Sequence, residues 1–171
     1  QNIPIRTEKG QLIRKAFVSR SDEFILLSAD YSQVELRIMA SFAQDETMMN
    51  AFQNGQDIHA ATASKIFDVS LDEVTPDMRR KAKTANFGII YGVSAFGLAQ
   101  RLSIPRSEAS AIIKSYFEQF PSVRQYMDKV IQQAREAGYV ETVLGRKRYL
   151  RDINSRNPTL RGYSERNAIN A

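Results

Sequence analysis

The chain has 171 residues, 43% of them hydrophobic, which is enough to bury one core. Lys and Arg number 24 against 19 Asp and Glu, and the resulting charge of +5 favours an anionic partner such as nucleic acid or a nucleotide. The absence of cysteine excludes disulfides and thiolate metal sites, and a single histidine argues against a histidine-rich metal site. No apolar run approaches the roughly 18 residues of a membrane span, so we expect no membrane partner.

The N-terminal part of the chain is predicted to contain one buried strand. FILLSAD, residues 24–30, is a short apolar run that ends in an acid, so Asp30 is expected at the tip of this strand. Ser32 followed three residues later by Glu35 fits a capping box, which predicts that a helix begins at Ser32.

The remainder is predicted to be helical apart from one β-hairpin, so the expected class is mostly α with a short buried strand and a hairpin. Asp57 is expected to cap a helix, Ser70 and Glu73 offer another cap, and Thr75 precedes a proline that opens a third helix. The hairpin is expected around Leu144 and Gly145. The predicted helices cover residues 45–54, 57–67, 76 to about 91, 107–120, 122–137 and 159 onward. A further short helix is expected after the interruption GVSAFG and ends at about residue 102.

The helix that contains RRKAKTANFGIIYG (79–92) has an unusual face. Residues spaced by four drift only about 40° per step around a helix, so two cations and two aromatics share one side with no acid: Arg79, Lys83, Phe87 and Tyr91. The opposite side is apolar and is predicted to pack on the core; it holds Met78, Ala82, Ala85 and Ile89. The stripe is either a solvent-exposed basic surface that happens to include two aromatic residues, or a binding surface for an anionic ligand with a flat part, such as a nucleotide.

Other polar residues have two interpretations each. Asp30 is an ordinary turn residue or a metal-binding carboxylate, and DYSQVELR joins it to a hydroxyl, an amide and Glu35 within six residues. His59 is a partly buried helix residue or a donor to a phosphate. Arg166 and Asn170 share a helix face and are either solvent-exposed or placed to reach phosphates, sugars or base edges. The chain contains no Walker-type phosphate loop and no convincing Ser/His/Asp set, which excludes kinase and hydrolase interpretations.

Two long segments carry a family resemblance. ADYSQVELRIMA (29–40) resembles motif A of the family-A DNA polymerases, and RRKAKTANFGIIYG resembles their motif B. QDIHAATA, AFGLAQRLSIPRSEA, GYVETVLGRKRYL and SERNAINA resemble the same family in the same order, so the similarity covers essentially the whole chain. Single-subunit RNA polymerases share a related helix, but FGIIYG favours a DNA polymerase.

The resemblance implies a bacterial, cytoplasmic and nucleoid-associated enzyme of DNA replication or repair. It would be a template-directed DNA polymerase, expected to be monomeric, that transfers nucleotides from deoxynucleoside triphosphates to a primer 3′-hydroxyl, with two Mg²⁺ ions and a DNA primer-template as partners. The chain would form the fingers subdomain and one edge of the palm of a right-hand polymerase. Residues 1–38 would be the palm-edge segment with motif A, and residues 39–171 the fingers, with the last helix returning toward the palm.

The resemblance also implies residue roles. Asp30 and the Tyr31 carbonyl would hold metal, and Lys83 would join Asp30 as a catalytic residue by protonating the departing pyrophosphate. The deoxynucleotide would be bound by Gln33, Glu35, His59, Arg79, Lys83, Phe87 and Tyr91, with Glu35 under the sugar's 2′ position. DNA would be contacted by Arg6, Tyr91, Arg166 and Asn170.

One part of the family pattern lies outside this sequence. The family's second metal-binding Asp, in a His-Asp-Glu motif, falls downstream of Ala171, the chain begins without Met, and its last residues stop within a helical pattern. We therefore expect a piece of a longer polymerase that is inactive alone. The alternative is a basic helical module that binds nucleic acid without catalysis.

Overall fold

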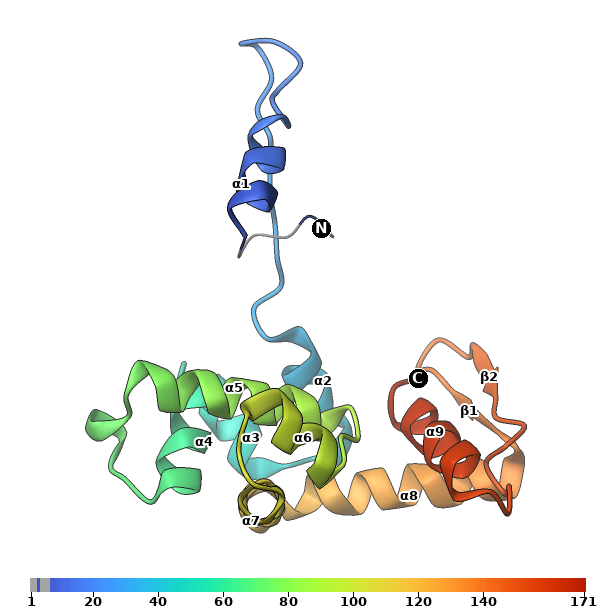
Figure 1. The fold of residues 1–171 in the computed structure, drawn as a ribbon. Coiled ribbons are helices and arrows are strands. Elements are labelled where there is room, and N and C mark those ends of the chain that lie inside the picture. Colours follow the sequence, from blue (N-terminus) through green and yellow to red (C-terminus); the bar gives the residue numbers. More distant parts are fainter. Residues whose placement is uncertain (1–2, 4–6) are drawn as a thin grey trace. The chain divides into compact units, whose positions relative to one another are not determined.

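In the computed structural model the chain separates into two compact units, Gln1–Ser32 and Gln33–Ala171. The structure describes residue 3 and residues 7–171. Within these residues the chain forms nine α-helices, one short 3-10 helix and one two-stranded antiparallel sheet (Figure 1). The mostly helical class with a β-hairpin is therefore confirmed.

The first unit contains α1 (Glu8–Lys15), whose N-cap Thr7 accepts a hydrogen bond from the Gly10 amide. The predicted buried strand over 24–30 is wrong, because these residues form no strand and all of them are exposed; Leu27 is 86% exposed. An apolar run becomes a buried strand only when a neighbouring strand binds its backbone and side chains cover its faces. In the part of the chain that the structure describes, the only strands pair with each other at 139–149.

The second unit is built from helices whose limits lie close to the predicted ones. They are α2 (Val34–Ala43), α3 (Glu46–Gln53), α4 (Ile58–Phe67), η1 (Leu71–Glu73), α5 (Pro76–Ile90), α6 (Ala95–Leu102), α7 (Arg106–Gln119), α8 (Pro121–Ala137) and α9 (Pro158–Ile169). Helices α2 to α8 share a core that includes Leu36, Met48, Ile58, Leu98 and Phe120. No helix in the described ranges is both long and apolar enough to cross a membrane.

Local capping explains most of these helix starts. Asp57 Oδ1 accepts from the amides of His59 and Ala60 at the start of α4, and the predicted capping box of Ser70 and Glu73 is present at η1. The predicted capping box of Ser32 and Glu35 is wrong. Helix α2 begins at Val34 after Gln33, which adopts a left-handed conformation (φ 53°, ψ 36°) without a side-chain cap, so Ser32 lies outside the cap position.

Helix α8 connects the main core to a smaller one at the C-terminal end (Figure 1). Strands β1 (Tyr139–Glu141) and β2 (Lys147–Tyr149) form the predicted hairpin, with Tyr139 opposite Tyr149. Helix α9 packs on α8, and the small core comprises Ala134, Leu150, Ile153 and Ala168. This packing places α9 where its last turn meets the end of α5.

Candidate functional site

Helix α5 presents its two sides as the spacing predicted. Ala82, Ala85 and Ile89 are buried in the core, whereas Arg79, Lys83 and Tyr91 are exposed. Phe87 differs from the other three stripe residues, because it is half-buried and packs against the core. The exposed stripe is therefore a surface that a ligand can reach, with one aromatic ring anchored beneath it.

The first half of α5 concentrates positive charge where the helix N-terminus already has a positive partial charge. Arg80 and Lys81 both pair with Asp77, with Lys81 Nζ 3.2 Å from its Oδ2. Arg79 Nε donates to Asp57 Oδ2 at 2.5 Å. Lys83 forms no ion pair within the residues that the structure describes. Lys83 is therefore the cation of this group that is left uncompensated.

Asp57 has a role that the sequence analysis missed. The local pattern predicts only a helix cap, yet one carboxylate caps α4 through Oδ1 and binds Arg79 through Oδ2. Partial burial works to raise the pKa of Asp57, but hydrogen bonds from Arg79 and the Ala60 amide outweigh it and the pKa is lowered. The stripe on α5 contains no acidic residue, and Asp57, the cap residue of α4, supplies the carboxylate that binds Arg79.

His59 lies in the first turn of α4 and is only 2% exposed. Its Nδ1 lies 3.0 Å from Asn86 Nδ2, and its ring centroid lies 5.7 Å from that of Phe87. Burial lowers the pKa of His59 to about 4; Asp57 works to raise it, while Arg79 and Lys83 lower it. At neutral pH the imidazole is therefore uncharged.

This neutral histidine should make the stability of the chain depend on pH. The pKa of His59 is about 4 in the folded chain, against an ordinary value of 6.5 for histidine. Between these values the unfolded chain binds more protons, so stability is complete above pH 6.5 and falls as the pH drops toward 4. The expected loss is about 3 kcal/mol in the free energy of unfolding. Denaturant unfolding at several pH values measures it.

The control is His59→Gln, which cannot titrate in this range and should show a smaller loss. Because the chain has a single histidine, an NMR titration of its ring signals is unambiguous. A midpoint near 6.5 would contradict the burial argument. The pKa of Asp57 in the folded chain is lowered below its ordinary value of 3.8. Its contribution to stability is therefore lost only as the pH falls below 3.8.

The C-terminal end of α5 forms a second group of candidate residues. The Tyr91 hydroxyl donates to Glu35 Oε1 at 3.0 Å, and Asn170 Nδ2 donates to the Tyr91 carbonyl at 3.4 Å. Burial raises the pKa of Tyr91, and the Glu35 carboxylate raises it further. Gly92 follows with a positive φ of 72°, and a β-carbon there would lie 3.1 Å from Arg166 Cγ. Helices α2, α5 and α9 therefore meet at this point.

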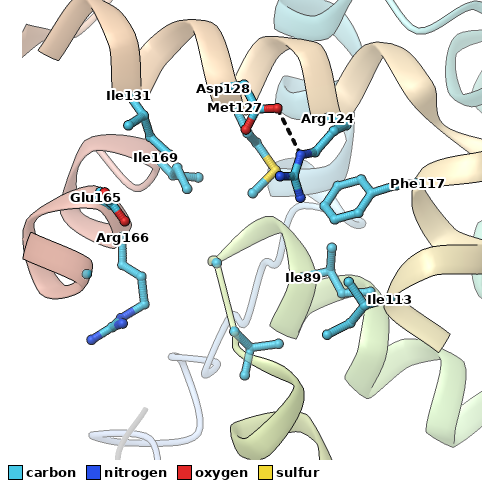
Figure 2. Close-up of a pocket in the computed structure, with 13 residues that line it drawn as sticks. Ile89, Ile113, Phe117, Arg124, Met127, Asp128, Ile131, Glu165, Arg166 and Ile169 are labelled. Carbon is cyan, nitrogen blue, oxygen red and sulfur yellow. Dashed lines mark hydrogen bonds and ion pairs between the residues drawn. The ribbon is translucent and has the colours of Figure 1, made fainter. Parts of the chain in front are cut away.

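A pocket of about 240 Å³ opens beside this meeting point (Figure 2). Its walls come from the end of α5 and from α7, α8 and α9, and they combine charged residues with apolar ones such as Ile89, Phe117 and Ile169. Arg166 lines one side, and the Arg124–Asp128 ion pair (2.9 Å) lines another. No local pattern in the sequence predicts this pocket, because its walls come from four separate helices.

The remaining candidates are Asp30, Tyr31, Gln33 and Arg6. Asp30 and Tyr31 belong to the first unit, and both are exposed. Gln33 precedes α2, and its buried Oε1 has no hydrogen-bond partner within the described ranges. Arg6 lies outside the residues that the structure describes. Among residues 3 and 7–171, no group of three or more His, Asp or Glu side chains is placed to hold a metal ion.

Comparison with known proteins identifies the family. Residues 1–171 match the family described as DNA polymerase family A. The chain belongs to this family. The family-A chain is 54% identical over 170 residues to DNA polymerase I of Bacillus caldotenax, and 54% identical over 172 residues to DNA polymerase I of Streptococcus pneumoniae serotype 4. It spans 99% and 100% of its own length in these matches, but only 19% and 20% of the relatives.

A solved structure has the same fold over nearly the whole family-A chain. It is described as the POL domain of Pol1 from M. smegmatis in complex with DNA primer-template and dNTP. The TM-score is 0.90 at 48% sequence identity, and the match covers 99% of this chain and 30% of that one. The helical architecture and the hairpin therefore match part of a polymerase domain.

Proposed function

We propose that this chain is the fingers segment, with one edge of the palm, of a template-directed DNA polymerase of the DNA polymerase I type. The observation that carries the proposal is the exposed stripe of α5, where Arg79, Lys83 and Tyr91 lie in motif order on one accessible face. The relative solved with primer-template and dNTP supports the choice of ligands. Residues 1–38 are assigned to the palm edge and 39–171 to the fingers, with α9 returning toward the palm.

The cationic half of α5 binds the triphosphate in this proposal. Phosphoryl transfer depends mainly on positioning and on stabilising charge that develops on the phosphates. Lys83, which has no acidic partner in the described part of the chain, neutralises the phosphates and protonates the departing pyrophosphate. Arg79 releases Asp57 and binds a phosphate in its place. The neutral His59 and Gln33 add hydrogen bonds to the phosphates.

The other end of α5 faces the sugar, the base and the template. Phe87 packs on the base and sugar, Tyr91 lies at the templating position, and Glu35, held by the Tyr91 hydroxyl, fills the space below the 2′ carbon. Arg166 and Asn170 contact template or primer close by, and Asn170 is already bound to the Tyr91 carbonyl. Arg6 is proposed to contact the minor-groove side.

Magnesium is part of the proposal, but the described residues do not form its complete site. A site for two ions would need more than one carboxylate to hold both of them. Asp30 is one exposed carboxylate, and the described residues include no cluster of three candidate ligands. When bound, such ions activate the attacking oxygen and stabilise the leaving phosphate. Asp30 and the Tyr31 carbonyl would supply only part of the ligands.

Primer extension tests the function. A full-length polymerase that contains this segment should extend a primer on a DNA template with deoxynucleotides and Mg²⁺, and Asp30→Ala should abolish the extension. The 171-residue chain alone should give none, because one carboxylate cannot organise two ions. Binding of DNA without extension by the full-length protein would favour the alternative, a non-catalytic basic module. Extension by the chain alone would contradict the proposed incompleteness.

The sugar-facing position of Phe87 gives a further prediction. A dideoxynucleotide lacks the 3′-hydroxyl that satisfies nearby phosphate oxygens, and an acceptor left unpaired in a desolvated site costs about 1–3 kcal/mol. Phe87→Tyr in the full-length enzyme supplies a hydroxyl from the protein side. We expect its use of dideoxynucleotides, relative to deoxynucleotides, to rise about 10- to 100-fold. Terminator incorporation ratios measure the change.

The matched control for this substitution is Phe96→Tyr, which adds the same hydroxyl to an exposed ring on α6, outside the motif on α5. It should leave the ratio unchanged. An unchanged ratio in Phe87→Tyr would show that the Phe87 ring does not face the sugar.

A further inference from the structure

A buried hydrogen-bond network connects α5 to α4 behind the cationic stripe. Asn86, on α5, is fully buried, and its Nδ2 lies 3.0 Å from His59 Nδ1 and 3.2 Å from Thr62 Oγ1. Thr62 is also fully buried, and its hydroxyl donates to the Ile58 carbonyl at 2.7 Å. No local sequence pattern connects Asn86 to the other two residues, since it lies 27 residues from His59 and 24 from Thr62.

The donors and acceptors of this network can be inferred from the single hydrogen of the Thr62 hydroxyl. A threonine hydroxyl has one hydrogen, and that of Thr62 is used on the Ile58 carbonyl, so Thr62 Oγ1 can only accept from Asn86. The atom of Asn86 that faces Thr62 must then be the NH₂ group. The same NH₂ group faces His59 Nδ1, which must therefore also accept. A neutral imidazole that accepts at Nδ1 carries its proton on Nε2.

The reversed amide is disfavoured by the same contacts. It would place the Asn86 oxygen 3.2 Å from the Thr62 oxygen with no hydrogen between them, and it would leave two buried N–H donors unpaired. In the observed orientation Asn86 Oδ1 is the only polar atom of these three side chains that is buried without a partner among the described residues. One unpaired acceptor costs less than two unpaired donors and a repulsive contact.

We propose that Asn86 and Thr62 are positioning residues that hold His59 as the tautomer with its proton on Nε2. The imidazole then presents a neutral N–H donor of fixed direction beside the cationic stripe. This inference rests on the proposed function only for the ligand, a nucleotide phosphate; the tautomer follows from the hydrogen bonds alone. Arg79 and Lys83 supply the charge at this place, and His59 supplies a directional hydrogen bond.

The charged groups around His59 are consistent with a neutral ring. Asp57 precedes it on α4 and favours the imidazolium, whereas Arg79 and Lys83 on α5 oppose it, and burial opposes it most. A positively charged ring would carry a proton on Nδ1 and would face the Asn86 NH₂ group donor to donor. Protonation would therefore break the network as well as place a charge in the interior.

The test is an NMR measurement of the two ring nitrogens in the 171-residue chain labelled with ¹⁵N-histidine. The single histidine makes the assignment direct. We expect an unprotonated nitrogen at Nδ1 and a protonated one at Nε2 at neutral pH. Thr62→Ser keeps the hydroxyl and should keep this pattern. Thr62→Val keeps the shape, removes the hydroxyl and should give a mixture of both tautomers.

A protonated Nδ1 in the unsubstituted chain, or an unchanged pattern in Thr62→Val, would overturn the proposal. The ligand is tested separately in the full-length enzyme, where Thr62→Val should raise the KM for deoxynucleotides several-fold and Thr62→Ser should not. If the expected tautomer is found but the KM is the same in both variants, the positioning of His59 for a phosphate is wrong, and the tautomer assignment stands. If the unsubstituted full-length protein does not extend a primer, the proposed function itself is wrong.

Discussion

Replacing Lys83 by alanine in the full-length polymerase is expected to lower kcat and kcat/KM together by about 10²- to 10⁴-fold, the range for loss of a positioned general acid. The reason is that Lys83 is exposed on α5 and has no ion-pair partner in the described residues. In the proposed function its full charge is available to a pyrophosphate whose negative charge grows as it departs. Binding of DNA should change little. Single-turnover rates at saturating nucleotide measure the effect.

Lys81→Ala is the matched control, since Lys81 lies two residues away on the same helix and is paired with Asp77. It removes the same charge and a similar chain length, so a general electrostatic effect of α5 would appear in both variants. We expect the single-turnover rate of Lys81→Ala to stay within a few-fold of the unsubstituted enzyme, as for other exposed ion pairs. Equal rates in the two variants would show that Lys83 has no special role in the chemical step.

Glu35→Ala is expected to lower discrimination between deoxy- and ribonucleotides by about 10²-fold or more. Glu35 lies in the first turn of α2, and the Tyr91 hydroxyl holds its carboxylate at 3.0 Å. In the proposed site this carboxylate lies below the 2′ carbon and excludes a hydroxyl there by contact, and alanine leaves space in its place. Ratios of kcat/KM for the two nucleotide types give the result directly.

Two comparison variants separate this effect from damage to the helix. Glu46 is also an exposed acid in the first turn of a helix, α3, so Glu46→Ala should lose a similar helix-dipole contribution without any change in sugar discrimination. Tyr91→Phe removes the hydrogen bond but keeps the carboxylate, and it should weaken discrimination less than Glu35→Ala. If Glu35→Ala discriminates as well as the unsubstituted enzyme, the residue serves only the helix.

Local features of the sequence were enough to predict much of the fold. Asp57 and Thr75 cap their helices through bonds to amides two or three residues away, so the pattern of a few neighbouring residues contains all the partners. The same is true of the spacing that puts Ala82 and Ala85 inside and Lys83 outside. The hairpin turn at Gly145, with a φ of 79°, is similarly local.

The two wrong predictions in the first 35 residues show where local patterns stop. The run 24–30 has the composition of a buried strand, but burial is a property of what surrounds a segment, and in the described structure nothing covers it. Ser32 and Glu35 have the spacing of a capping box, but the left-handed turn at Gln33 moves the helix start to Val34. Neither outcome can be read from the residues themselves.

The sequence by itself determined the family of this protein, the helices and the order of the residues along α5, because these depend on motifs and on bonds between near neighbours. Only the tertiary structure decided which partners those residues have. Arg79 meets Asp57 across 22 residues, Tyr91 meets Glu35 across 56, and Asn170 meets Tyr91 across 79. The physical reason is that a hydrogen bond requires its atoms within about 3.5 Å, and only the packing of α2, α4 and α9 against the rest of the core brings such distant residues that close.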